Sequence, residues 1–180
     1  MARPINVWCK SATASLFAAA LLAAFPAEAA SPAPIKLAIF DFELEDFTDR
    51  PLAAAETPSD AEHLRRVTDE VRQLLAQSGR YDLIDVGGAG AAAVKAHALR
   101  ECNGCDAGIA LKLGAEQSFV GVVRRISRTE YTVRFQILDA RNGSVISSGD
   151  SGLRMGADYS WNRGAARLIK DQLLESRAQQ

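Results

Sequence analysis

Two cysteines three positions apart, Cys102 and Cys105, constrain the fold of this chain more than any other feature. The residues between them, Asn103 and Gly104, are small and turn-forming, so the ring between the cysteines can close. In an oxidising compartment such a pair predicts a tight disulfide that pins the connection between two short helices. Two other interpretations stay open from the residues alone, a thiol-disulfide exchanger and a metal site.

The pair stands just before a predicted helix, and this position favours the exchanger. A cysteine at a helix N-terminus has a lowered pKa, and the thiolate is the form that exchanges. Against it, all six prolines lie at or before Pro58, so none follows the pair as in thioredoxin-like proteins. A metal site would combine the cysteines with His97 and Asp106, which gives only three Cys or His ligands where structural zinc usually has four. We therefore expect a structural disulfide, no metal and no cofactor.

The first thirty residues have the pattern of an export signal. Arg3 and Lys10 are followed by the apolar run from Leu16 to Phe25 and by the small-residue site Ala27-Glu28-Ala29. We expect residues 1–30 to be cleaved after passage through the Sec route, which predicts a periplasmic protein. No later run is apolar for long enough to span a membrane.

The charge of the remaining chain is nearly balanced. After residues 1–30 are removed, 19 Lys and Arg residues face 21 Asp and Glu residues. This balance gives no electrostatic reason to expect nucleic acid or an anionic membrane surface as a partner. About 150 residues are enough for one domain with a sizeable core.

The hydrophobic pattern predicts alternating strands and helices, then strands, then a last helix. After a short lead-in at 31–34 and before a tail at 178–180, the expected strands are 35–42, 81–86, 118–127, 131–137 and 144–155. The expected helices are 57–79 (capped by Thr57 or by Ser59), a short one within 87–99, 106–113 and 160–177. Residues 43–56 are predicted to be a polar loop, and Asn142-Gly143 a hairpin turn. The order β-α-β-α-β-β-β-α predicts a single α/β (α+β) domain over 35–177, with a mixed sheet of about five strands and helices packed on it.

Two further pairs of residues are candidates for partner or ligand contact. Asp41 and Glu43 lie at the end of the first predicted strand, where α/β proteins often bind ligands, although a solvated loop is the simpler interpretation. Trp161 and Arg163 are of the types that dominate interfaces, although Trp161 also fits a core position on the last helix. The Gly88–Ala93 run matches a phosphate-binding pattern weakly, and we interpret it as a connector.

Several motifs together resemble a bacterial exported family of unknown function. They are the Cys102-Asn103-Gly104-Cys105-Asp106 run, the Ser160-Trp161-Asn162-Arg163-Gly164 run and the first strand Phe40-Asp41-Phe42-Glu43. The family's Gly-Asn-Thr-Asp run is replaced here by Gly156-Ala157-Asp158-Tyr159. The resemblance implies an accessory role beside periplasmic quinoprotein alcohol oxidation. More distantly, the element order is similar to small domains of Tol-translocation, curli-secretion and penicillin-binding-protein-activator proteins, which mostly bind proteins.

These patterns favour a non-catalytic periplasmic accessory module that binds a protein partner. The alternative is a periplasmic thiol-disulfide redox protein that uses Cys102 and Cys105. A weaker alternative is a carrier of a small ligand or a metal at the carboxyl ends of the strands.

Overall fold

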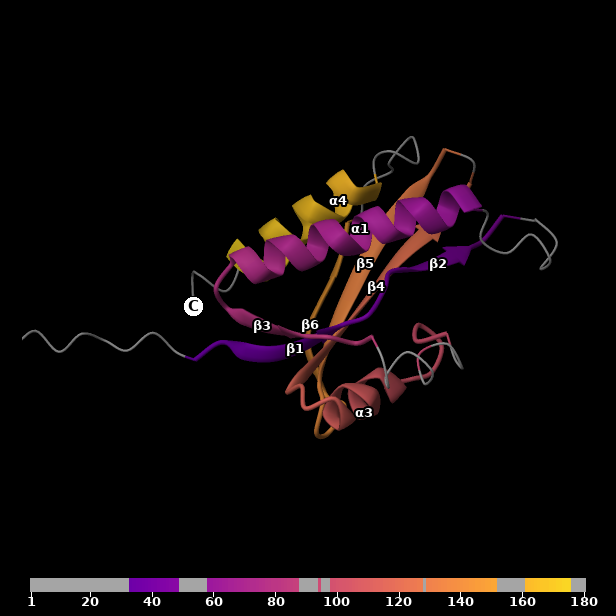
Figure 1. Ribbon diagram of the computed structural model, residues 1–180. Helices are drawn as coiled ribbons and strands as arrows, with labels where there is room; N and C mark the ends of the chain where they lie inside the picture. Colours follow the sequence, from indigo (N-terminus) through magenta and orange to yellow (C-terminus); the bar gives the residue numbers. More distant parts are fainter. Residues whose placement is uncertain are drawn as a thin grey trace, which may run out of the picture. The chain divides into compact units, whose positions relative to one another are not determined.

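One mixed six-stranded sheet organises the computed structural model, which describes residues 33–48, 58–87, 94, 98–127, 129–151 and 161–175 (Figure 1). The strands are β1 (Ile35–Ile39), β2 (Glu43–Asp46), β3 (Tyr81–Ile84), β4 (Gln117–Arg125), β5 (Tyr131–Asp139) and β6 (Val145–Asp150). The helices are α1 (Pro58–Gln77), α3 (Cys105–Lys112) and α4 (Trp161–Leu168), which continues as the π-helical segment η2 (Ile169–Glu175). The predicted signal peptide lies outside the described residues.

The strand order is β3-β1-β4-β5-β6, with β2 beside β4. β1 is parallel to both β3 and β4, because helical connections return the chain to the same end of the sheet. β4, β5 and β6 are antiparallel neighbours, and the β5–β6 turn contains the predicted Asn142-Gly143 hairpin. The prediction of a single α/β (α+β) domain with a mixed sheet is therefore confirmed.

β2 corrects the prediction of a polar loop over 43–56. β1 pairs with β4 at Leu37–Ile39, and β2 pairs with the same strand farther along, at Glu43–Asp46. Between them the backbone N–H of Phe42 donates to Thr68 Oγ1 of α1 at 2.9 Å. The predicted strand 35–42 therefore ends at Ile39, and the chain resumes pairing after this break.

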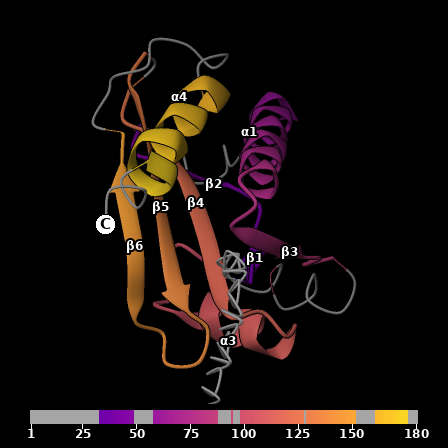
Figure 2. The ribbon, with the colours of Figure 1, turned by 90° about the vertical axis from the view of Figure 1, so that its left-hand side faces the viewer.

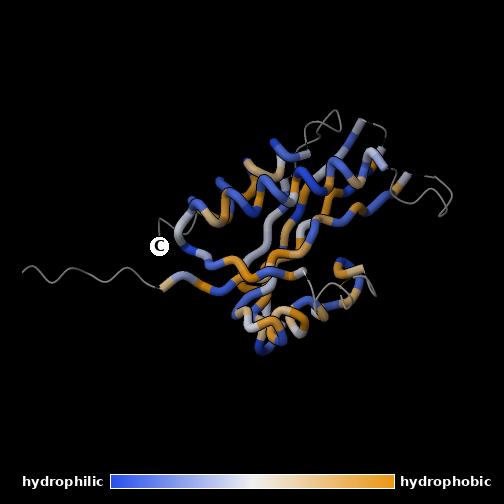
Figure 3. Tube along the Cα trace, in the orientation of Figure 1, coloured by the Kyte–Doolittle hydropathy of each residue, from blue (hydrophilic) through white to orange (hydrophobic). Residues whose placement is uncertain are grey.

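Helices cover the two faces of the sheet unequally (Figures 1 and 2). α1 and α4 pack on one face, where their apolar stripes cover the inward side chains of β1, β4 and β5. In Figure 3, hydrophobic (orange) stretches lie in the strands and in α3, while α1 contains many hydrophilic (blue) positions. On the opposite face α3 packs on β4 over a smaller cluster that includes Phe40, Leu99 and Val122.

The remaining helix predictions hold with one change of geometry. α1 is described from Pro58 and ends just before Gly79, and the predicted cap Thr57 lies outside the described residues. The last helix buries the expected positions Trp161 and Leu173, but it changes from α- to π-helical geometry at Ile169. Most of the predicted helix within 87–99 lies outside the described residues. No helix among the described residues is long and apolar enough to cross a membrane.

Candidate functional site: a groove beside the CNGC loop

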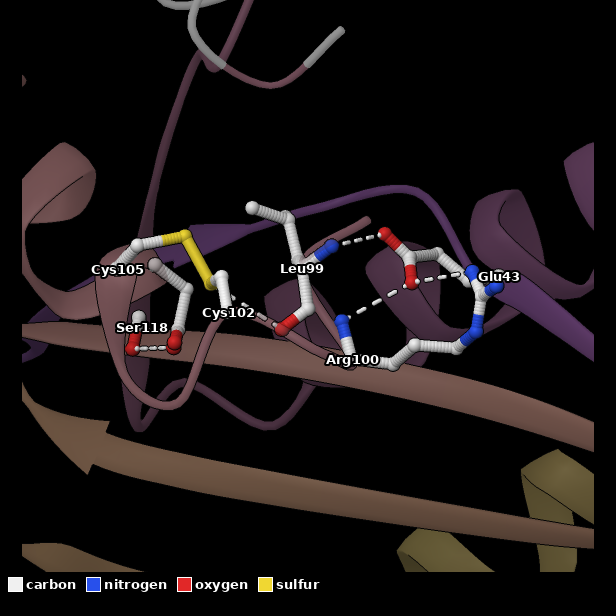
Figure 4. Close-up of a disulfide and its surroundings, with 7 residues drawn as sticks. Glu43, Leu99, Arg100, Cys102, Cys105 and Ser118 are labelled. Carbon is white, nitrogen blue, oxygen red and sulfur yellow. Dashed lines mark hydrogen bonds and ion pairs between the residues drawn. A yellow bond between two sulfur atoms is a disulfide. The ribbon is translucent and has the colours of Figure 1, made fainter. Parts of the chain in front are cut away.

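The CNGC loop, residues 98–104, contains a tight turn that the two cysteines close (Figure 4). The sulfur atoms of Cys102 and Cys105 are 2.00 Å apart, a disulfide distance, and Cys105 is the first residue of α3. Asn103 and Gly104 have φ angles of 50° and 99°, in the left-handed region that Asn tolerates and Gly adopts freely. The Asn-Gly pair of the motif is thus the pair that this turn requires.

Glu43 of β2 anchors the start of the loop (Figure 4). Its carboxylate accepts hydrogen bonds from the backbone N–H of Leu99 at 2.6 Å and of Arg100 at 3.0 Å. It also accepts one from the guanidinium of Arg100 at 3.1 Å. The predicted ligand-contact residue Glu43 is therefore occupied by contacts within the chain.

Asp106 anchors the other side of the motif. Its buried carboxylate accepts a hydrogen bond of 2.5 Å from the hydroxyl of Ser118, at the start of β4. Asp106 lies in the first turn of α3, where the helix dipole favours a negative charge. All five residues of the CNGCD motif thus take part in building or holding one turn.

A groove of about 690 Å³ runs between the CNGC loop and strands β4 to β6. Arg100, Asn103 and Gly104 form its wall on the loop side. Its floor and far side are formed by apolar residues of β4 and β5 and by polar residues of β5 and β6: Val120, Val122, Leu138, Arg134, Gln136 and Ser148. The groove lies on the face that carries α3, which packs on β4 and is only eight residues long. Its size is that of sites that hold small ligands or peptide segments.

Alternating charges line the sheet beside the groove. Glu45 of β2 bonds to Arg124 at 2.7 Å and lies 3.7 Å from Arg134. Glu43 and Glu45 point to the same face because strand side chains alternate. The two glutamates thus lie opposite three arginines, which come from the CNGC loop, β4 and β5.

The other predicted contact residues lie away from the groove. Asp41 is exposed and pairs with Arg72 at 3.0 Å, beside a second cavity of about 510 Å³ at the carboxyl ends of β1 and β3. Trp161 is fully buried on the α1 face, where its ring lies 5.3 Å from that of Tyr131. Arg163 is exposed on the same helix as Trp161. The structure therefore brings none of these three residues together with Glu43.

A buried cluster that the sequence patterns did not predict surrounds Arg125, the last residue of β4. The Arg125 guanidinium bonds to Asp60 of α1 and, at 2.9 Å, to Asp46 of β2. It also lies 5.8 Å from the ring of Trp161. Burial alone would lower the pKa of Arg125, but the hydrogen bonds to the two aspartates raise it above the ordinary value. The signal in the sequence for this cluster was an arginine at the end of a mostly apolar predicted strand.

The described residues contain no group of three His, Cys, Asp or Glu side chains placed to hold a metal ion. His97, which the metal interpretation needed, lies outside the described residues. Among the described residues, the side chains around Cys102 and Cys105 form hydrogen bonds and line a groove, and they do not form a set of metal ligands.

A family model described as "Protein of unknown function (DUF2380)" and named DUF3280 matches residues 35–173. The chain belongs to the DUF3280 family. The match includes β1, β2, the CNGC loop and most of the C-terminal helix. Membership of a family of unknown function, which the motifs predicted, is therefore confirmed.

Similar solved structures include three with low identity to this DUF3280 chain. The LpoB C-terminal domain from Salmonella enterica is 17% identical, with 68% of this chain and 84% of that chain covered and a TM-score of 0.46. A PelC dodecamer from Paraburkholderia phytofirmans is 19% identical, with 78% and 86% covered and a TM-score of 0.41. TolB from Acinetobacter baumannii is 14% identical, with 76% and 27% covered and a TM-score of 0.40.

Proposed function

We propose that this protein is a non-catalytic periplasmic accessory module that binds a protein partner in the groove beside the CNGC loop. The observation that carries the proposal is the use of the CNGCD motif. Asn103, Gly104 and Asp106 line the groove, and the two cysteines close the turn that holds them. Because the residues of this motif form one wall of the groove, they support binding of a protein partner at that wall.

In this proposal the Cys102–Cys105 disulfide is structural. Glu43 and Asp106 hold the two sides of the turn independently of the sulfur atoms. The disulfide adds a covalent limit to the same turn, and it forms in the oxidising periplasm. Residues 1–30 serve as the Sec signal and are removed after Ala29 or Ala30, which leaves a single domain over 35–177. The resemblance of the motifs supports an association with periplasmic quinoprotein alcohol oxidation.

Site-specific photo-cross-linking in the periplasm tests the binding site. Two exposed glutamines form a matched pair: Gln136 lies in the groove, and Gln73 lies on the outer side of α1. A photoreactive residue at position 136 is expected to capture the same partner protein in repeated experiments. The same residue at position 73 is expected not to capture that protein. No adduct at position 136, or the same adducts at both positions, would contradict the proposed site.

A second candidate function is thiol-disulfide exchange, which one observation favours. Cys105 is the first residue of α3, and both cysteines are partly exposed. A thiolate at a helix N-terminus is stabilised and therefore suited to exchange. Titration of the pair against glutathione separates the two functions, since an exchanger has a potential near that of the glutathione pool and a structural disulfide resists reduction.

A further inference from the structure

We infer that the groove binds an extended segment of the partner that carries an apolar side chain and, four residues away, an acidic side chain. This inference rests on the proposed function, because it specifies the chemistry of the partner at the same groove. It follows from the order of side chains along β5 and from an arginine whose charge is only partly used.

The groove side of β5 presents three different side chains in a row. Leu138, Gln136 and Arg134 alternate with the buried Ile137 and Phe135, so they point to the groove. Successive members of the row are about 6.8 Å apart, because a strand rises about 3.4 Å per residue. An extended peptide has the same repeat, so its alternate side chains can match an apolar, an amide and a cationic position in turn.

The apolar end of the row is well defined. Leu138 is buried, and Val120 and Val122 of β4 continue the apolar floor beside it. Gly104 of the CNGC loop faces Leu138, and a methyl group on Gly104 would lie 3.9 Å from Leu138 Cδ1. An aliphatic side chain fits this end, where it would contact the floor and the loop.

The cationic end has an incompletely neutralised guanidinium. Arg134 is 39% exposed and its one ion-pair contact with a described residue is Glu45 at 3.7 Å. That carboxylate already bonds to Arg124 at 2.7 Å, so it neutralises Arg134 weakly. Across the groove, the guanidinium of Arg100 already pairs with Glu43 at 3.1 Å and with Glu101 at 3.0 Å, so Arg134 carries the available positive charge. A carboxylate beside Arg134 would be bound by charge-assisted hydrogen bonds.

The position of Arg134 favours an acidic side chain over a chain terminus. Arg134 is the fourth residue of β5, and the half-buried Thr132 continues the same face beyond it. A bound segment can therefore run on past the arginine. The carboxylate is thus expected on a side chain within the bound segment rather than at its end.

Pools of blocked nonapeptides test this inference with the full mature protein from the periplasm. Each pool is random except for one leucine and, four residues before or after it, either glutamate or glutamine, with both orders present in every pool. The protein is immobilised, and retained peptides are counted by mass spectrometry. We expect the glutamate pool to be retained about tenfold more than the glutamine pool, the size of one good ion pair. Arg134→Gln should abolish the preference, while Arg134→Lys should keep part of it.

Arg141→Gln is the matched control, because Arg141 is an exposed arginine at the β5–β6 turn and does not line the groove. It should leave the preference unchanged. A third pool, with glutamate three residues after leucine, places the two side chains on opposite faces of an extended chain. If this third pool is retained as well as the glutamate pool with the four-residue spacing, the extended binding mode is overturned. Equal retention of the glutamate and glutamine pools would overturn the acidic preference, and the cross-link at position 136 would still decide the proposed function separately.

Discussion

At the scale of single residues, the CNGC loop is held by two carboxylates rather than by the disulfide alone. Glu43 accepts two backbone N–H groups of the loop, and Asp106 fixes the start of α3 on Ser118. Each buried donor that loses its acceptor costs about 1–3 kcal/mol. This is comparable with the stabilisation of about 2 kcal/mol that the entropy model gives for so short a disulfide ring.

Glu43→Gln should therefore destabilise the protein by about 1–3 kcal/mol, because one backbone donor and the guanidinium of Arg100 lose a charged acceptor. Urea unfolding measures the change, and amide exchange at Leu99 and Arg100 should become faster. Glu101→Gln is the control, since Glu101 is an exposed partner of the same arginine. Its effect should stay within about 0.5 kcal/mol. Equal effects of the two substitutions would contradict the anchoring role of Glu43.

Two glycines nearby should respond in opposite directions to the same substitution. Gly104 has a φ of 99°, so Gly104→Ala forces a side chain into the left-handed region and should cost about 1–2 kcal/mol. Gly108 is exposed within α3, and a methyl group there meets nothing within 4 Å. Gly108→Ala should stabilise the helix by about 0.5–1 kcal/mol. Thermal unfolding of both variants checks the signs, and a neutral Gly104→Ala would show that the turn does not need its glycine.

At the scale of elements, the sequence pattern predicted the strands and helices whose apolar residues have a clear period. β2 escaped prediction because Glu43-Leu44-Glu45-Asp46 is mostly acidic and has low strand propensity. Its pairing depends on tertiary partners, since Glu45 and Asp46 lie beside Arg124 and Arg125 in the register. The groove could not be predicted for the same reason, because it forms only where the folded chain places the CNGC loop beside β5 and β6.

The Arg125 cluster joins four elements, so its loss should be severe. Arg125→Met leaves the buried carboxylate of Asp60 without its cation and should cost about 3–5 kcal/mol. Arg124→Met, one residue earlier on the opposite face, removes a partly exposed ion pair and should cost about 1 kcal/mol or less. Urea unfolding of both variants compares the two faces of β4. A cost for Arg125→Met no larger than for Arg124→Met would rule out the joining role.

At the scale of the whole molecule, the same cluster predicts a loss of stability in acid. Burial alone would raise the pKa of Asp46, but hydrogen bonds from Thr48 and Arg125 hold the pKa below its ordinary value. The ionised form therefore stabilises the folded state above about pH 4, the ordinary value for an unfolded aspartate. This contribution is lost as the pH falls through the lower pKa of the folded state.

Asp46→Asn should thus reduce the free energy of unfolding at pH 7, and the difference from the wild type should shrink as the pH falls below about 4. Urea unfolding from pH 7 to pH 3 follows this difference. Asp82→Asn, at an exposed position of β3, is the control and should change little at any pH. A difference for Asp46→Asn that stays constant with pH would contradict the assigned cause.

Unfolding combined with partner capture in Cys102→Ser/Cys105→Ser protein tests whether the CNGC loop acts by its shape or by thiol chemistry. If the disulfide is structural, the variant loses about 2 kcal/mol, which lowers the thermal midpoint by about 4–8 °C. Glu43 and Asp106 still hold the turn, so a photoreactive residue at position 136 should capture the same partner in cells kept cool. An unchanged midpoint together with loss of capture would contradict the account and identify thiol chemistry as the function of the loop.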